Sequence, residues 1–262
     1  MIFKDLGVIE YKKAWDYQEE LLQSNVAIKS ARRKELVDFM LEPLPVGDTN
    51  VSYSPMGQLP SSNPQPANLN PQPATRNYFL LCEHPPVYTL GKSGKKEHVL
   101  LSNNELLQHD IAFYQTNRGG DITFHGLQQI VGYPILDLEN YGTDIGRYLR
   151  NLEELIILTI SEFGLKGERS KGETGVWIEP GVPGRERKIC AIGVRCSRWI
   201  TMHGFALNVN TDLRYFDHII PCGIRNKQVT SIEKELGWKL DYTEVKEKIK
   251  MNFEKVFNSV LK

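Results

Sequence analysis

The clearest periodic pattern of hydrophobic positions lies between residues 145 and 163, where apolar side chains recur every three to four residues. This spacing predicts an amphipathic α-helix, which Asp144 can cap at its beginning and Gly164 at its end. The same period predicts a last helix over 245–260. The first apolar face consists of Ile145, Tyr148, Leu149, Leu152, Leu155, Ile156, Thr159, Ile160 and Phe163, and the second of Val245, Ile249, Phe253, Val256, Phe257 and Val260.

Other helices are predicted near the N-terminus and after residue 230. The pattern favours helices over 14–22 and 31–41, separated by a break near Ser24. The sequence Thr-Ser-Ile-Glu at 230–233 has the spacing of a capping box, which predicts a short helix that stops at Gly237.

Between the helices lie short apolar segments bounded by Gly and Pro, which are typical of β-strands. Strands and helices alternate along the chain, and no internal repeat is visible. The sequence therefore predicts an α/β protein with a mixed sheet. The expected strands are 78–82, 87–90, 111–114, 122–124, 131–136, 175–178, 188–194 and 201–209.

One segment, from Pro43 to Pro73, interrupts this pattern because Pro, Asn, Ser and Gln dominate it. Such a composition buries too little apolar surface to offset the entropy of ordering. We expect a single domain over 1–262 with an insertion at 43–76. The insertion is either disordered or a lid or partner-docking loop.

Composition and charge narrow the function classes. The 32 Lys and Arg residues balance the 32 Asp and Glu residues, so the net charge is zero and a general nucleic-acid binder is not expected. No apolar run has the roughly 18 residues of a membrane span, and the first residues lack the layout of a signal peptide. We therefore expect a cytoplasmic protein that binds neither nucleic acid nor membrane.

The four cysteines form no CxxC pair, which argues against a zinc site, so we expect no metal. Cys82 and Cys190 lie within apolar strand segments, as buried structural cysteines do. Cys222 lies between Pro221 and Gly223, on a turn, and is the best candidate for a reactive nucleophile among the four.

Three glycine-rich segments, at 118–126, 188–193 and 201–210, are candidates for close approach of a ligand to the backbone. Lys188 begins the second one, where a lysine is either solvated or placed to steer an anion or stabilise a thiolate. His125 and His203 each precede a glycine and are candidates to line one site. The other histidines have no metal-ligand spacing and are expected to be at the surface or in hydrogen-bonded structure.

Together these segments resemble the lipoyl(octanoyl) transferase family. The matching stretches, which fall between about residues 78 and 240, are RGGDITFHG at 118–126, YPILDL at 133–138, ETGVWIE at 173–179, the long block from Lys188 to Ile224 and TSIEKELG at 230–237.

The resemblance implies the α/β catalytic domain shared by biotin and lipoate protein ligases. It implies that Cys222 accepts the acyl group and that Lys188 is the active-site lysine that lowers the pKa of the thiol. The donor would be octanoyl-acyl carrier protein. The acceptor would be a lysine on a lipoyl domain of a 2-oxoacid dehydrogenase complex or of the glycine cleavage H-type protein, with no cofactor. The implied substrate-binding residues are Arg118, Gly119, Gly120, Asp121, Ile122, Thr123, Phe124, His125, Ala191, Ile192, Gly193, Gly204, Phe205 and Ala206.

The sequence departs from the family pattern at three positions. Leu127 and Gln128 replace a Pro and a Gly after the first motif, and Phe124 replaces a Tyr. Two alternatives remain: an ATP-dependent lipoate or biotin ligase, which Cys222 argues against, and a non-catalytic scaffold that binds lipoyl domains, which only the altered loop favours.

Overall fold

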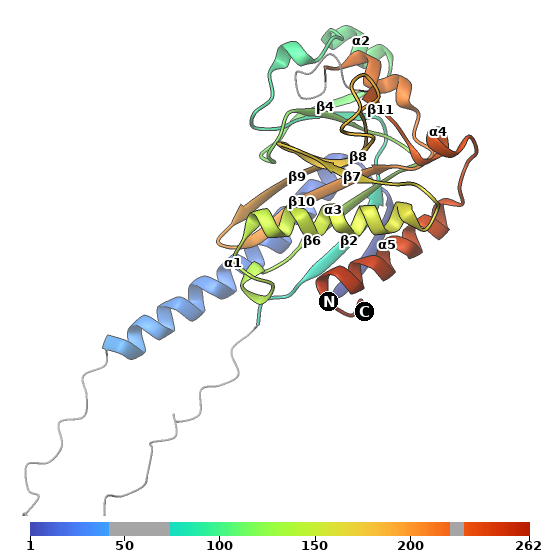
Figure 1. Ribbon diagram of the computed structural model, residues 1–262. Coiled ribbons are helices and arrows are strands. Elements are labelled where there is room, and N and C mark those ends of the chain that lie inside the picture. Colours follow the sequence, from blue (N-terminus) through green and yellow to red (C-terminus); the bar gives the residue numbers. More distant parts are fainter. Residues whose placement is uncertain (42–73, 221–227) are drawn as a thin grey trace, which may run out of the picture.

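The computed structural model describes residues 1–41, 74–220 and 228–262 (Figure 1). Most of the predicted insertion at 43–76, and Cys222 with its neighbours in the sequence, lie outside the described residues. The domain organisation and the role of Cys222 therefore stay predictions.

The larger sheet is mixed and has the strand order β1-β2-β6-β10-β9-β8-β7, with β11 paired to β9. Strand β1 runs parallel to β2, and β11 parallel to β9, whereas the other pairs are antiparallel. This confirms the predicted mixed α/β fold. The strands are β1 (Ile2–Val8), β2 (Tyr78–Glu83), β6 (Gln129–Ile135), β7 (Glu168–Ser170), β8 (Glu173–Ile178), β9 (Arg187–Ser197), β10 (Ile200–Asn208) and β11 (Gln228–Val229).

Helices cover both faces of this sheet (Figure 1). Helices α3 (Ile145–Ser161) and α5 (Tyr242–Phe257) pack side by side on one face, and their apolar stripes form the largest buried cluster with strand residues such as Phe79 and Phe205. The predicted helices at 145–163 and 245–260 are thus present. On the opposite face, α1 (Tyr11–Leu41) packs Ala14, Leu21 and Leu22 against the alternate side chains of β2, β6 and β10.

A second, smaller sheet has the order β4-β3-β5 and is separate from the larger one (Figure 1). Its own core contains Tyr88, Phe124 and Ile219. Its strands are β3 (Val87–Leu90), β4 (Ala112–Gln115) and β5 (Ile122–His125). The helix α2 (Asn103–Gln108) and the 3₁₀ helices η1 (Lys96–His98) and η3 (Leu213–His218) accompany them.

The predicted break near Ser24 is wrong, because α1 is one continuous helix. The adjacent Asn25 is buried, and its side chain exchanges hydrogen bonds of 2.8 Å with both the backbone N–H and the carbonyl of Arg76. This tertiary contact outweighs the low helix propensity of the Ser-Asn pair.

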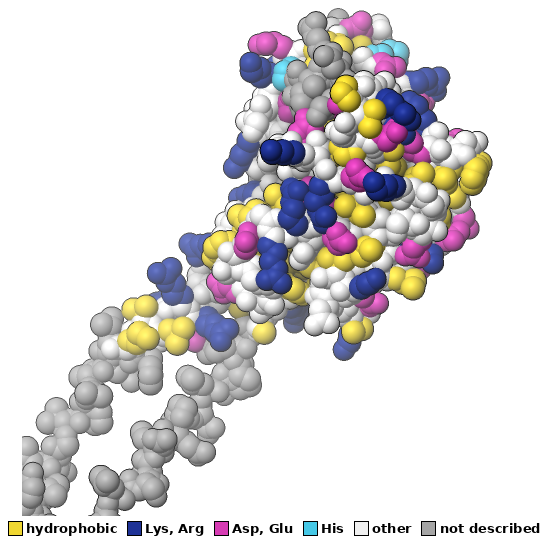
Figure 2. All heavy atoms as spheres, in the orientation of Figure 1, with side chains coloured by type: hydrophobic (Ala, Val, Ile, Leu, Met, Phe, Trp, Pro, Cys, Tyr) yellow, Lys and Arg dark blue, Asp and Glu magenta, His cyan; other side chains and the backbone are white. Residues whose placement is uncertain are grey.

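Beyond Ser30 the helix α1 leaves the body of the protein, and its side chains from residues 31 to 38 are exposed (Figure 1). Leu36, Val37 and Met40 are among the exposed apolar side chains, next to basic ones (Figure 2). None of the described helices is long and apolar enough to cross a membrane.

The predicted caps are confirmed in part. The Asp144 side chain accepts a hydrogen bond from the backbone N–H of Arg147 at the start of α3. The capping box expected at 230–233 is wrong by one residue: Ser231 caps α4 (Ile232–Leu236) and accepts from Lys234 N–H, so no Glu stands at the reciprocal position. Gly237 ends α4 at φ 87°, as expected.

The remaining described 3₁₀ helix is η2 (Leu138–Asn140), which precedes α3.

Candidate active site

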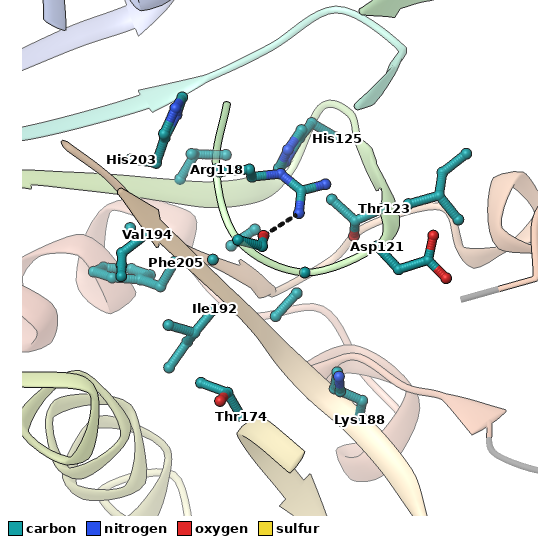
Figure 3. A pocket seen from close by; sticks show the side chains of 18 of the residues that line it. Arg118, Asp121, Thr123, His125, Thr174, Lys188, Ile192, Val194, His203 and Phe205 are labelled. Atoms are coloured by element: carbon teal, nitrogen blue, oxygen red, sulfur yellow. Dashed lines mark hydrogen bonds between the residues drawn. The ribbon is translucent and has the colours of Figure 1, made fainter. Parts of the chain in front are cut away.

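A cavity of about 530 Å³ lies between the glycine-rich loop 118–121 and the strands β9 and β10 (Figure 3). This volume is in the range of small-molecule sites. The cavity follows β9 from Lys188 to Val194, which is about 20 Å of strand.

Nearly all the residues that the sequence resemblance implied for substrate binding line this one cavity. The exception is Phe124, which does not line the cavity. Thr123 and His125 face the cavity, whereas Phe124 lies between them on the opposite face of β5 and stacks on Tyr215 in the core of the small sheet. The lining residues foreseen from the sequence are Arg118, Gly119, Gly120, Asp121, Ile122, Thr123, His125, Lys188, Ala191, Ile192, Gly193, Gly204, Phe205 and Ala206.

The glycines at the centre of β9 and β10 serve the backbone packing. Gly193 and Gly204 are directly opposite one another in the antiparallel register. A Cβ at Gly193 would lie 2.9 Å from the carbonyl oxygen of Gly119, and one at Gly204 would lie 2.1 Å from that of Gly132. The close neighbour that the sequence predicted at Gly193 is therefore the loop 118–121. The loop is fastened there by the Gly119 N–H, which donates to the Val194 carbonyl at 2.9 Å.

Arg118 is a buried cation that holds this loop in place. Its guanidinium donates to the Thr89 carbonyl at 2.6 Å and to the Thr89 hydroxyl at 3.0 Å, which ties the loop to β3. A further bond of 3.0 Å reaches the Gly119 carbonyl (Figure 3). The arginine thus connects the small sheet to the loop beside β9.

Two buried histidines line the cavity, as the sequence suggested. Burial lowers the pKa of His203 to about 3, and burial also lowers the pKa of His125 well below its ordinary value. His203 Nε2 lies 2.7 Å from Asn117 Oδ1, and His125 Nδ1 lies 2.8 Å from Gln129 Oε1. Both imidazoles are therefore neutral near pH 7.

Behind His125 lies a group of aromatic side chains from distant parts of the chain. Tyr11 stacks on His125 with ring centres 5.8 Å apart, and His84 Nε2 lies 2.8 Å from the Tyr133 hydroxyl. Burial raises the pKa of Tyr11 to about 12 and lowers that of His84 to about 4. His84 is thus hydrogen-bonded structure, as expected. This end of the cavity is polar, and Arg118 contributes a positive charge there.

Lys188 lies at the end of the cavity away from His203 (Figure 3). It pairs with Trp177 of β8 on one side and with Val229 of β11 on the other. Its ammonium lies 4.6 Å from the centre of the Trp177 ring, a cation–π distance that fixes the direction of the side chain. The strand-end lysine is therefore part of the cavity wall.

The three described cysteines are poor candidates for a nucleophile. Cys82 and Cys190 are fully buried in β2 and β9, where burial raises the pKa of each thiol. Cys196 is half-buried, and burial raises its pKa as well. Among the described residues, no three His, Cys, Asp or Glu side chains are grouped so that they could hold a metal ion.

Several lining residues were not given a site role from the sequence. Glu173 and Thr174 belong to the ETGVWIE stretch, so their signal was present but was assigned no function. Tyr11, Gln129 and Asn208 line the cavity without any motif to single them out.

The altered loop after His125 keeps a left-handed residue. Gln128 has φ 62°, a conformation that glycine adopts without strain. Its N–H donates to Glu83 at 2.7 Å, and its side-chain oxygen accepts from the Asn210 amide at 2.9 Å. Its carbonyl also accepts from the Thr211 hydroxyl at 3.0 Å. These bonds hold the loop in place without the family's glycine.

Comparison with known proteins agrees with this geometry. Residues 67–254 match the model of the lipoyl protein ligase A/B catalytic domain. Octanoyltransferases of Christiangramia forsetii and Flavobacterium johnsoniae are 51% and 52% identical to this chain, and the matches cover 99% and 98% of this chain and 96% of each relative.

Solved structures show the same fold. A bipartite lipoate protein ligase from Thermoplasma acidophilum has a TM-score of 0.58 at 17% identity and covers 71% of this chain and 73% of its own. A lipoate-protein ligase A bound with ATP has the same TM-score at 14% identity, over 71% of this chain and 75% of its own. The chain therefore belongs to the lipoyl protein ligase A/B family and, within it, to the octanoyltransferases.

Proposed function

We propose that this acyltransferase moves an octanoyl group from octanoyl-acyl carrier protein, through a thioester on Cys222, to a lysine of a lipoyl domain. The observation that carries the proposal is the assembly of the 118–125, 191–193 and 204–206 segments around one cavity with Lys188 in its wall. The identity of about 50% to octanoyltransferases over nearly the whole chain supports the acyl group.

The acyl chain fits the middle of the cavity, where the lining is apolar. Ile192 and Phe205 are opposite one another on β9 and β10, and Leu149 of α3 also lines the cavity. Burying a methylene group is worth about 0.8 kcal/mol, so these side chains favour an apolar chain over a polar substrate.

The chemistry requires a thiolate near Lys188. The sulfur of Cys222 attacks the carbonyl carbon of the donor thioester, and the carrier's thiolate leaves. The lysine amine of the acceptor then attacks the enzyme thioester, the Cys222 thiolate leaves, and a base takes the proton of the amine. An ammonium favours the thiolate form, and a deprotonated Lys188 would be the base for the second step.

Two strand pairings support our proposal that Cys222 lies near Lys188. Gln228 and Val229 pair with Arg187 and Lys188, so the chain that follows Cys222 in the sequence returns to β9 at the lysine. Burial or a raised pKa makes the three described cysteines poor nucleophiles, which supports the choice of Cys222 in this proposal.

Intact mass spectrometry after mixing with octanoyl-acyl carrier protein tests the proposal without ATP. We expect one octanoyl group on Cys222, its transfer to an added lipoyl domain, and no adduct in Cys222→Ser, with Cys196→Ser as the matched control. A normal adduct in Cys222→Ser would refute the nucleophile. A requirement for ATP would favour the ligase alternative instead, and absence of any transfer would favour the scaffold.

A further inference from the structure

The segment 91–100 connects two parts of the protein that the proposed reaction needs to hold together. On one side it is bonded to the glycine-rich loop that lines the cavity. Gly91 N–H donates to the Asp121 carbonyl at 3.1 Å, and Ser93 N–H donates to the Gly120 carbonyl at the same distance. Lys92 N–H also donates to the Arg118 carbonyl at 3.0 Å.

On its other side the segment pairs with residues 218–220, the last ones described before Cys222 in the sequence. Leu100 N–H donates to the His218 carbonyl at 2.9 Å, and Ile220 N–H donates to the His98 carbonyl at 2.8 Å. Between them Val99 and Ile219 form an antiparallel bridge, and Ile219 is buried in the core of the small sheet. The position of residues 218–220 is therefore set by the backbone of residues 98–100.

The side chain of His98 joins the two sides. Its Nδ1 lies 2.6 Å from Asp121 Oδ2, so the Nδ1–H donates to the carboxylate. Both side chains are largely buried, at 18% and 9% exposed. The other carboxylate oxygen of Asp121 is buried and has no hydrogen-bond partner among the described residues, which makes the imidazole the principal anchor of this side chain there.

We propose that His98 is a positioning residue for acyl transfer. Through Asp121 its side chain is fixed to the wall of the acyl cavity, and through its own carbonyl it fixes Ile220, two residues before Cys222 in the sequence. The inference rests on the proposed function, because it assigns to His98 the alignment between the cavity and the chain that carries the nucleophile. A misplacement of about 1 Å is enough to slow such a reaction on the order of 100-fold.

The test is the single-turnover rate of Cys222 acylation by octanoyl-acyl carrier protein, measured by intact mass. We expect His98→Ala to slow acylation at saturating donor at least tenfold with little change in the donor concentration at half-maximal rate. His98→Asn keeps an N–H near the position of Nδ1 and should retain most of the rate. Glu97→Ala, an exposed neighbour in the same 3₁₀ helix, is the matched control and should equal the unchanged chain.

A double-mutant cycle with Asp121→Ala checks the route of the effect and remains informative if His98→Ala folds poorly. Asp121→Ala alone should slow acylation, and adding His98→Ala should cost little more. The inference is wrong if His98→Ala acylates at the normal rate or alters only the donor concentration at half-maximal rate. It is also wrong if the effects of the two substitutions on the acylation rate multiply. Absence of an adduct on Cys222 in the unchanged chain would instead overturn the proposed function and this inference with it.

Discussion

Replacing Gly193 by Ala tests whether this glycine is required by the protein backbone or by the ligand. The added Cβ would lie 2.9 Å from the Gly119 carbonyl oxygen and 3.3 Å from Arg118 Cδ, whereas ordinary contacts begin at 3.4 Å. The loop 118–121 must therefore move by about 0.5 Å. Both neighbours are held by hydrogen bonds, Gly119 N–H to Val194 at 2.9 Å and Arg118 to Thr89 at 2.6 Å, so the loop cannot shift freely.

Overpacking of this kind typically costs about 1–3 kcal/mol. For a domain of this size each kcal/mol lowers Tm by roughly 2–4 °C, so we expect a fall of about 2–12 °C. Because the displaced loop lines the cavity, kcat/KM for octanoyl transfer should fall about tenfold as well. Differential scanning calorimetry and a steady-state transfer assay measure the two effects.

Gly181→Ala is the matched control, because its φ is not positive and a Cβ there meets nothing within 4 Å. Its Tm should change by less than about 1 °C. If Gly193→Ala melts like the unchanged chain but has a raised KM, the glycine is there for the ligand, and the backbone explanation fails.

Three further predictions follow from the charge and backbone conformation of the site. Lys188→Met should raise the pH midpoint of Cys222 alkylation by about one unit and slow transfer, whereas Lys188→Arg should keep the midpoint; an unchanged profile in Lys188→Met would make the lysine only part of the wall. Gln128→Gly should be about 1 kcal/mol more stable in urea unfolding than Gln128→Ala, because only the alanine retains the left-handed strain; equal stabilities would contradict this. The folded-state pKa of His203 is depressed to about 3, so its contribution to stability is present above pH 6.5 and is lost as pH falls toward 3. The Tm of His203→Gln should therefore fall less steeply below pH 6, and parallel curves would contradict the burial argument.

Much of the fold was predictable because it is encoded locally. The apolar period around Leu152 defines α3, and Asp144 caps it as expected. The continuity of α1 through Ser24 was not predictable, because Asn25 is held by Arg76, a residue far along the chain. The strand β1 (Ile2–Val8) was also missed, because its pairing with β2 depends on a contact across the whole insertion.

The residues of the candidate site were predictable where they belong to a sequence motif, and the other site residues were not. The resemblance identified the 118–125 segment as a run and therefore included Phe124, although strand alternation places that ring on the far face from His125. Tyr11 stacks on His125 from the start of α1, and no local pattern in the sequence predicts a contact between residues so far apart in the chain. The structure thus adds to the site the residues that only tertiary packing brings in.

Close backbone contacts at three glycines bear on where substrate specificity resides. A Cβ at Gly91 would lie 2.3 Å from the Gly120 carbonyl oxygen, and those at Gly193 and Gly204 meet backbone oxygens in the same way. Because these approaches are between parts of the protein, a change of acyl chain would leave the requirement for all three glycines unaltered. We therefore expect discrimination between acyl chains to come from the side chains that face the cavity, such as Ile192 and Phe205, which lie opposite one another on β9 and β10.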